Sequence, residues 1–222
     1  MARIPVTSID EIKSNNLIVV PATSVAAAAI NTSKEPSRPI LGDVQVEQGP
    51  DGTSVVATDS YCLSVILHEK LVSENENSVL VPIQLIKDMK VFPTTPKAGD
   101  LFAIAEDKST HGFAMRFSYY TATSNAKMMQ AGPSCVVDVD DSGNYPDWKR
   151  LVPTTPNLGE TAVFNTSYLA RLDRMVELLL KNGSGKYGRA AEVCNLDGHS
   201  PILFSAKFEG TELKYLVMPV HK

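Results

Sequence analysis

The stretch Ala57-Thr58-Asp59-Ser60-Tyr61-Cys62-Leu63 is the most distinctive part of the chain. Two segments far from it share its apolar and turn-forming character, Tyr145-Pro146-Asp147-Trp148-Lys149-Arg150 and Tyr215-Leu216-Val217-Met218-Pro219-Val220. None of the three holds a set of side chains that suits catalysis. We therefore expect them to serve binding, with the last strand-like run presenting its edge to a partner.

Composition narrows the class of protein. With 222 residues, 43% of them hydrophobic, the chain can form one large or two small globular domains. It has no apolar run of about 18 residues and no signal-peptide pattern at its start, so we expect a cytoplasmic protein with no membrane partner. Three widely spaced cysteines, Cys62, Cys135 and Cys194, indicate neither a disulfide framework nor a zinc site. We expect no metal and no cofactor.

A weak repeat divides the chain into segments of about 6–72, 78–152 and 160–222, each of which reads as βαβββ. In the first, a strand at 17–21 precedes a helix at 25–30, with Thr23 as a plausible N-cap, and a hairpin turns at Gly49-Pro50-Asp51-Gly52. The predicted fold class is α+β, with antiparallel sheets that carry helices on one face.

The second and third segments repeat this order. Strands at 78–81, 101–104 and 113–118 accompany a helix that starts near Pro82 and runs through Lys90. In the third segment a strand at 161–164 leads into a helix from Ser167 to about Lys181, followed by three more strands. Residues 120–144 are the least regular.

The helix of the third segment has an apolar stripe and a basic stripe. Side chains at three- and four-residue spacing must face a core, namely Leu169, Leu172, Val176 and Leu179. Positive side chains gather on other faces of this helix and of the second one: Arg171, Arg174, Lys181, Lys87 and Lys90. An ordinary solvated helix face explains them equally well, because Asp88, Asp173 and Glu177 dilute the charge. The net charge of −4 allows only a local basic face.

With these units in place, the chain resembles the bacterial DNA sliding clamp, the β subunit of the replicative DNA polymerase. Residues 37–42 with the hairpin and residues 56–65 look like the first half of the clamp's middle domain, and residues 78–153 look like its second half. Phe164-Asn165-Thr166-Ser167-Tyr168-Leu169 and the segment 215–220 look like the closing half of the last domain. The resemblance implies one domain over 1–153 and a half-domain over 154–222.

In that family βαβββ units form a ring whose helices line a hole for duplex DNA. The resemblance implies a polymerase processivity factor, associated with the nucleoid, that is not an enzyme and reads no sequence. The DNA contacts would come from Lys87, Lys90, Arg171, Arg174 and Lys181, through the phosphates.

A second implied site is a hydrophobic pocket for peptides of DNA polymerase, the clamp loader and other clamp-motif proteins. It would comprise Leu41, Thr58, Ser60, Tyr61, Cys62, Leu63, Pro146, Arg150, Leu151, Leu216, Met218, Pro219 and Val220. For Leu216 and Met218, the ordinary core of a final strand remains the alternative. The family's usual Gly-His-Arg is Ser60-Tyr61-Cys62 here, so a cationic wall of the pocket is expected to be lost.

Three units make one and a half domains, so we expect self-association, with an open sheet edge covered by another chain. The main rival is a clamp-derived adaptor that keeps the pocket and never encircles DNA.

An enzyme is a second rival. Asp138, Asp140 and Asp141 resemble a metal-binding loop, but a solvated loop fits them better. The glycines at 183, 185 and 188 follow a helix where a dinucleotide motif follows a strand.

Overall fold

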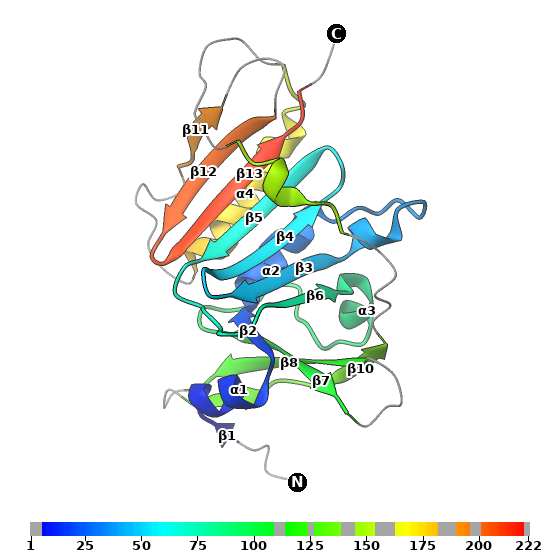
Figure 1. The fold of residues 1–222 in the computed structure, drawn as a ribbon, viewed down its shortest axis with the longest axis vertical. Coiled ribbons are helices and arrows are strands. Elements are labelled where there is room, and N and C mark those ends of the chain that lie inside the picture. Colours follow the sequence, from blue (N-terminus) through cyan, green and yellow to red (C-terminus); the bar gives the residue numbers. More distant parts are fainter. Residues whose placement is uncertain are drawn as a thin grey trace.

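The protein folds into two antiparallel sheets with helices packed against them, which confirms the predicted α+β class (Figure 1). This computed structural model describes residues 6–108, 114–123, 127–138, 145–153, 163–181, 190–195 and 201–219. The glycine segment 183–188, together with Val220, Asp140 and Asp141, lies outside these residues. No helix in the described part combines the length and the apolar composition that crossing a bilayer requires.

The smaller sheet has six strands in the order β1-β9-β8-β7-β2, with β10 paired to β8. Its strands are β1 (Val6–Thr7), β2 (Ile18–Pro21), β7 (Leu101–Asp107), β8 (Ala114–Ala122), β9 (Met128–Gln130) and β10 (Cys135–Asp138). The larger sheet has seven strands in the order β11-β12-β13-β5-β4-β3-β6. Its strands are β3 (Val44–Gly49), β4 (Gly52–Thr58), β5 (Cys62–His68), β6 (Asn77–Val81), β11 (Glu192–Asn195), β12 (Ile202–Phe208) and β13 (Thr211–Val217).

The strand order ties the predicted segments together. Strand β2 comes from the first segment but pairs with β7 of the second, while β6 comes from the second segment and pairs with β3 of the first. The third segment extends the sheet of the first, because β13 lies antiparallel to β5 along its whole length. One edge of the third segment is therefore already covered within the chain.

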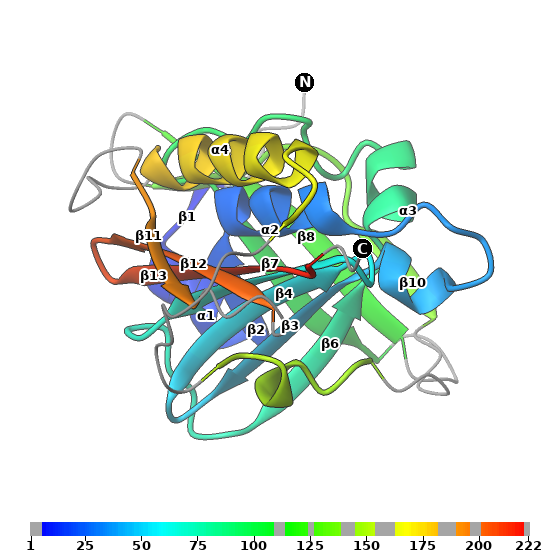
Figure 2. The ribbon, with the colours of Figure 1, turned by 90° about the horizontal axis from the view of Figure 1, so that it is seen from above.

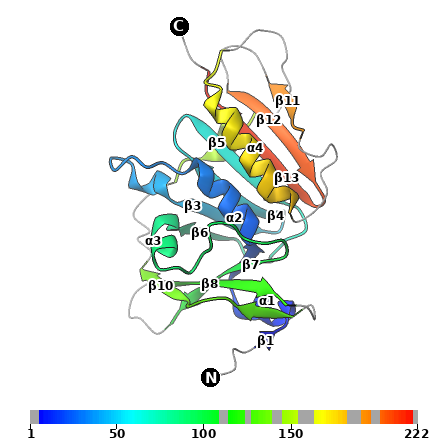
Figure 3. The same ribbon diagram turned by 180° about the vertical axis from the view of Figure 1, so that it is seen from behind.

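Three of the four α-helices lie on one side of the sheets (Figures 2 and 3). These are α2 (Ala22–Ala28), α3 (Ile83–Asp88) and α4 (Ser167–Leu180). Every residue of α2 is buried, and its small side chains let α4 pack closely beside it. Short 3₁₀ turns cover Ala29–Asn31 (η1), Pro39–Gly42 (η2) and Trp148–Arg150 (η3). The main core lies between these helices and the sheets.

Helix α4 confirms most of the predicted apolar stripe. Leu172, Val176 and Leu179 are buried, and Met175 is buried with them. The prediction was wrong for Leu169, which is 38% exposed. It lies in the first turn, at the rim of a buried stripe that Met175 completes on the other side.

Helix α3 is shorter than predicted. It ends at Asp88, and Lys90 has a left-handed backbone with φ of 57°. The amide of Lys90 donates to the carbonyl of Lys87 at 2.9 Å, and the amide of Val91 donates to the carbonyl of Ile86 at 3.0 Å. This is a Schellman-type C-cap, in which buried Val91 also packs near the helix, so Lys90 stands beyond the helix and not on it.

Two helix starts also differ from the prediction. Helix α2 begins at Ala22, so Thr23 is a buried residue inside its first turn and not the N-cap. The sequence analysis missed α1 (Ile9–Asn15), whose N-cap Ser8 accepts a hydrogen bond from the amide of Glu11 at 3.1 Å. The pattern Ser-x-x-Glu was the available signal. Val163 and Phe164, predicted as strand, have no strand partner, and residues 161–162 lie outside the described part.

His68 sits in the core between three elements. One ring nitrogen lies 2.9 Å from Ser24 Oγ of α2, and the other lies 3.0 Å from Thr211 Oγ1 of β13. Burial lowers the pKa of His68 from 6.5 to about 4, because the charged ring loses its hydration. The folded chain therefore keeps the ring neutral at a pH where the unfolded chain protonates it.

This histidine predicts acid lability. Its contribution to stability is intact above pH 6.5 and is lost progressively as the pH falls to about 4. The loss should reach about 3 kcal/mol at the acid end. Urea unfolding at a series of pH values should show this slope, and His68→Gln should flatten it, because the other groups titrate alike in both proteins. Parallel curves for the two proteins would contradict the prediction.

Candidate functional site

A tight turn of residues 58–62, here called the Asp59 turn, joins β4 to β5. The Asp59 carboxylate accepts hydrogen bonds from the amides of Tyr61 at 3.0 Å and Cys62 at 2.9 Å. Ser60 has a left-handed backbone with φ of 78°, and its amide donates to Thr58 Oγ1 at 3.1 Å. The side chain of Tyr61 is left 63% exposed at the tip. The turn is therefore an ordered loop that presents one aromatic ring.

The three distinctive segments of the sequence meet beside this turn. The amide of Met218 donates to the carbonyl of Tyr61 at 2.9 Å. In the β13–β5 pairing, Leu216 lies opposite Leu63. Trp148, from η3, packs with these two leucines in one cluster on the sheet face away from the helices (Figure 2). Segments that lie far apart in the sequence therefore build one surface.

The predicted pocket residues divide into three groups. Those that are buried are Leu41, Thr58, Cys62, Leu63, Leu216 and Pro219. Those that are exposed are Ser60, Tyr61, Arg150, Leu151 and Met218, with Pro146 half-buried. Leu216 is 2% exposed and lies in the strand core, whereas Met218 is 45% exposed. Val220 lies outside the described residues.

Two of these residues do not face the apolar surface. Cys62 belongs to the core on the helix side of the sheet, and its thiol contacts Asn31 Oδ1 at 3.3 Å. Burial, followed by the charge of Asp59, raises the pKa of this thiol to about 12, so it stays protonated. Arg150 pairs with Asp147 at 2.8 Å. Trp148, quoted in the motif but not assigned to the pocket, contributes more to the surface than either.

A cavity of about 680 Å³ lies next to this surface, at the β3–β4 hairpin. It is lined by residues 47–54, 67–69, 76–78, 148 and 149, and none of the predicted pocket residues lines it. Lys149 Nζ lies in it, 3.2 Å from Glu47 Oε2 and 5.5 Å from the centre of the Trp148 ring. No local pattern in the sequence predicts this cavity, because turn and strand-end residues form it.

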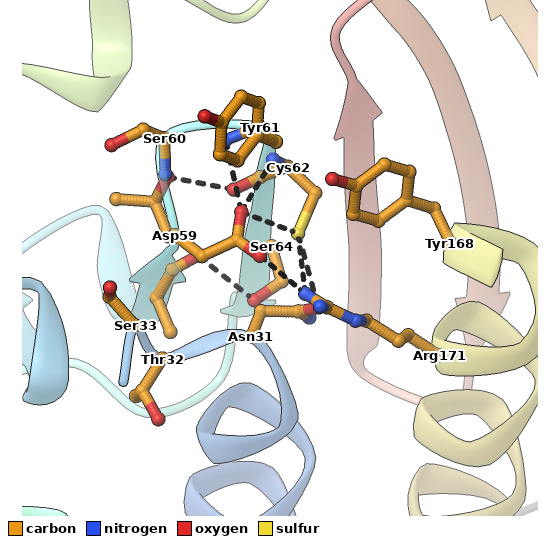
Figure 4. Close-up of polar contacts among 12 residues, drawn as sticks. Asn31, Thr32, Ser33, Asp59, Ser60, Tyr61, Cys62, Ser64, Tyr168 and Arg171 are labelled. Atoms are coloured by element: carbon orange, nitrogen blue, oxygen red, sulfur yellow. Dashed lines mark hydrogen bonds and ion pairs between the residues drawn. The ribbon is translucent and has the colours of Figure 1, made fainter. Parts of the chain in front are cut away.

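Behind the Asp59 turn, on the helix side, Arg171 of α4 reaches across to the carboxylate (Figure 4). Its Nη1 lies 2.5 Å from Asp59 Oδ2 and 3.4 Å from Cys62 Sγ, and its guanidinium covers the Tyr168 ring at 5.1 Å. Burial alone would raise the pKa of Asp59, but hydrogen bonds from Arg171 and from the turn amides lower it below its usual value. Arg171 therefore places a cation near Cys62 on the helix side of the sheet, and the expected loss of a cationic wall on the pocket side stays a prediction.

The remaining predicted cations occupy two places. Arg174 is exposed on α4, near exposed Asp173 and Glu177, and Lys181 is half-buried at the end of that helix. Lys87 and Lys90 are exposed at α3. Burial and the nearby positive charge of Lys34 lower the pKa of Lys87. Lys34 therefore adds to a local positive patch, which the sequence analysis missed because the residue follows the helices instead of lying on one.

The described side chains include two cysteines and one member of the predicted aspartate loop. Cys62 and Cys135 are free and buried, and within the described residues no group of three histidine, cysteine or acidic side chains could hold a metal ion. Asp138 is part of β10, where it pairs with Ala114. His111, His199 and His221 lie outside the described residues. What the site offers is an apolar surface on one side and cations on the other.

Comparisons with known proteins support the fold. No protein-family model matches the sequence, and no curated protein matches it. Solved structures do match. The DNA polymerase sliding clamp of Bacillus subtilis matches with a TM-score of 0.52 and 16% identity, over 92% of this chain and 64% of that one. The DNA polymerase III β subunit of Pseudomonas aeruginosa matches with a TM-score of 0.55 and 14% identity, over 92% of this chain and 66% of that one. The β subunit of the Streptococcus pyogenes DNA polymerase matches with a TM-score of 0.55 and 17% identity, and the match covers all of this chain and 68% of that one.

These structures match over nearly the whole chain, in agreement with the resemblance of the three motifs. The chain spans about two thirds of the length of each. At this level of identity the likeness establishes architecture. The protein therefore has the fold of the bacterial DNA polymerase III β sliding clamps, in a shortened form.

Proposed function

We propose that this protein is a shortened sliding clamp that acts as a processivity factor, docking peptides of a DNA polymerase and a clamp loader and holding duplex DNA without reading its sequence. The observation that supports it best is the convergence of three distant segments into one apolar surface. We call the exposed side chains Tyr61, Leu151 and Met218 the docking surface. Each is a near neighbour in the chain of one member of a buried cluster that contains Leu63, Leu216 and Trp148.

The physics of this surface suits a receptor for short peptides. Tyr61 contributes an aromatic ring on an ordered turn, and Met218 contributes a flexible thioether that adapts to differently shaped anchors. The cluster beneath them is rigid, because Leu63 and Leu216 are paired across two hydrogen-bonded strands. A few apolar anchors of a peptide can supply most of the affinity on such a surface.

The proposed DNA contacts lie on the helix side, where Lys34, Lys87 and Lys90 gather near α3 and Arg174 and Lys181 belong to α4. Contacts of this kind bind phosphates, so affinity falls steeply with salt and does not depend on sequence. Such contact lets a protein slide along duplex DNA.

Lys87→Gln should weaken binding to every duplex alike. The slope of log affinity against log salt should decrease by about one if the side chain neutralises one phosphate. Fluorescence anisotropy with two unrelated duplexes at several salt concentrations measures both effects. Lys13→Gln is the matched control, because Lys13 is exposed on α1, which packs on the other face of the smaller sheet. Equal slopes for the wild type and Lys87→Gln would exclude this lysine as a phosphate contact.

A second candidate function is an adaptor that docks peptides and does not encircle DNA. The charge on the helix side favours it: Arg171 is paired with Asp59, Arg174 lies near two exposed acidic residues, and α2 carries no charged residue. The positive field is therefore concentrated near α3 and does not extend over the whole helix face.

The two functions differ in assembly. The strand order of the larger sheet ends at β11 and β6 in the described residues, so both outer strands are available to another chain. For a clamp we expect light scattering to give a mass of more than one chain, and we expect retention on circular DNA that linearisation releases. A monomer that binds the polymerase peptide and shows no preference for circular DNA would establish the adaptor instead.

A further inference from the structure

We propose that Arg171 is a positioning residue for the Asp59 turn, and that its ion pair with Asp59 holds Tyr61 and Met218 in the geometry that accepts a peptide. This inference rests on the proposed docking function and assigns Arg171 to that function instead of to DNA. It concerns how α4, on the helix side of the larger sheet, supports the docking surface on the other side.

The ion pair is short and shielded. Arg171 Nη1 and Asp59 Oδ2 are 2.5 Å apart, with the two side chains 34% and 13% exposed. Partial burial leaves this pair less screened by salt than an exposed one. The guanidinium carbon also lies 5.1 Å from the centre of the Tyr168 ring of its own helix, a cation–π contact that favours this position of the side chain. The charge of Arg171 is therefore paired with Asp59, and its guanidinium is oriented by Asp59 and Tyr168.

Asp59 connects this cation to the turn. One carboxylate oxygen takes Arg171, and the other accepts the amides of Tyr61 and Cys62. The backbone between them includes Ser60 in a left-handed conformation, which a non-glycine residue keeps only when its surroundings enforce it. Loss of the cation would free the carboxylate to turn towards water, and the turn would lose the acceptor that enforces this backbone.

The Asp59 turn also fixes the position of the docking surface. The carbonyl of Tyr61 accepts a hydrogen bond from the amide of Met218, so movement of the turn moves these two exposed side chains together. A second tie from α4 runs through Asn31, which donates to Met175 Sδ at 2.9 Å and accepts from the Cys62 thiol at 3.3 Å. Figure 4 shows Asn31 and Arg171 approaching the turn from two different helices. Contacts from η1 and α4 on the helix side thereby set the shape of the docking surface on the other side of the sheet.

The test compares Arg171→Met, Asp59→Asn and the double variant, with Arg174→Met as the control from the next turn of α4. Amide hydrogen exchange at Tyr61, Cys62 and Met218 reports on the turn. Anisotropy with a labelled peptide from the clamp-binding segment of a bacterial replicative polymerase reports on docking, and a labelled duplex reports on DNA.

Arg171→Met should speed exchange at the turn amides and lower peptide affinity roughly five- to tenfold, with duplex affinity and its salt slope unchanged. Asp59→Asn should do the same, and the double variant should lose no more than either single one, because the two side chains act as a unit. Arg171→Lys should restore part of the protection. Arg174→Met should leave the turn and peptide binding as in the wild type and should weaken duplex binding, because Arg174 is one of the proposed DNA contacts.

Exchange rates that stay at wild-type values in Arg171→Met would overturn the positioning role. So would a loss of duplex affinity with a reduced salt slope, which would return Arg171 to the DNA contacts. If the wild type fails to bind the peptide, the docking function is refuted, and the exchange data still decide separately whether Arg171 orders the turn.

Discussion

Met218→Glu should reduce affinity for a polymerase clamp-binding peptide by about thirtyfold or more, and it should leave the stability of the protein almost unchanged. Met218 is 45% exposed, so the substitution removes little of the core. In the complex the same position would be covered by apolar peptide anchors, which would force a carboxylate out of water. Loss of one central anchor commonly costs about 2 kcal/mol, which corresponds to this factor.

The matched control is Met89→Glu. Met89 is also 45% exposed, but it is the C-cap of α3 and is not part of the docking surface. It should leave peptide affinity unchanged and weaken DNA binding, because it adds a negative charge beside Lys90. Titration of both variants with the same labelled peptide measures the difference. Equal affinities for the two variants would mean that the docking surface lies elsewhere.

Tyr215→Ala should cost about 3–5 kcal/mol of unfolding free energy, because it empties a fully buried aromatic site. Tyr215 belongs to β13, which joins the third segment to β5 of the first. Its ring contacts Phe204 with centroids 6.5 Å apart, and its hydroxyl donates to the carbonyl of Tyr168 at 3.2 Å. A domain is commonly stable by only about 5–15 kcal/mol, so this loss is a large fraction of the total.

Tyr215→Phe separates packing from hydrogen bonding and should cost about 1 kcal/mol. Urea unfolding followed by circular dichroism measures both variants. Because the larger sheet is continuous from β11 to β6, we expect one cooperative transition in the wild type and a weaker one in Tyr215→Ala. A small effect of the alanine variant would contradict the close packing of Tyr215 against Phe204 and α4.

Local patterns in the sequence predicted most of the elements. The turn at residues 49–52 and the alternating strands beside it are encoded by neighbours in the chain, as is the apolar stripe of α4. Pairing between segments is not encoded in this way. The exchange of β2 and β6 between sheets, and the addition of β13 to β5, depend on which edges are available after each segment has formed.

The candidate site shows the same division. The resemblance to the clamp family assigned Tyr61 and Met218 to a pocket, whereas only the structure shows that both are exposed. Spacing on α4 placed Arg171 on a basic stripe but could not reveal its partner, since Asp59 lies more than a hundred positions away. The positive charge of Lys34 was missed for a similar reason: its neighbourhood with Lys87 exists only in the folded chain.

Methionine methyl NMR tests the docking surface most directly. The chain has seven methionines, of which Met218 lies at the docking surface and Met89 lies beside α3. Titration with the polymerase peptide should shift the Met218 methyl signal in proportion to saturation and leave that of Met89 in place, whereas a duplex should shift Met89 alone. A Met218 signal that does not respond to saturating peptide would contradict the account.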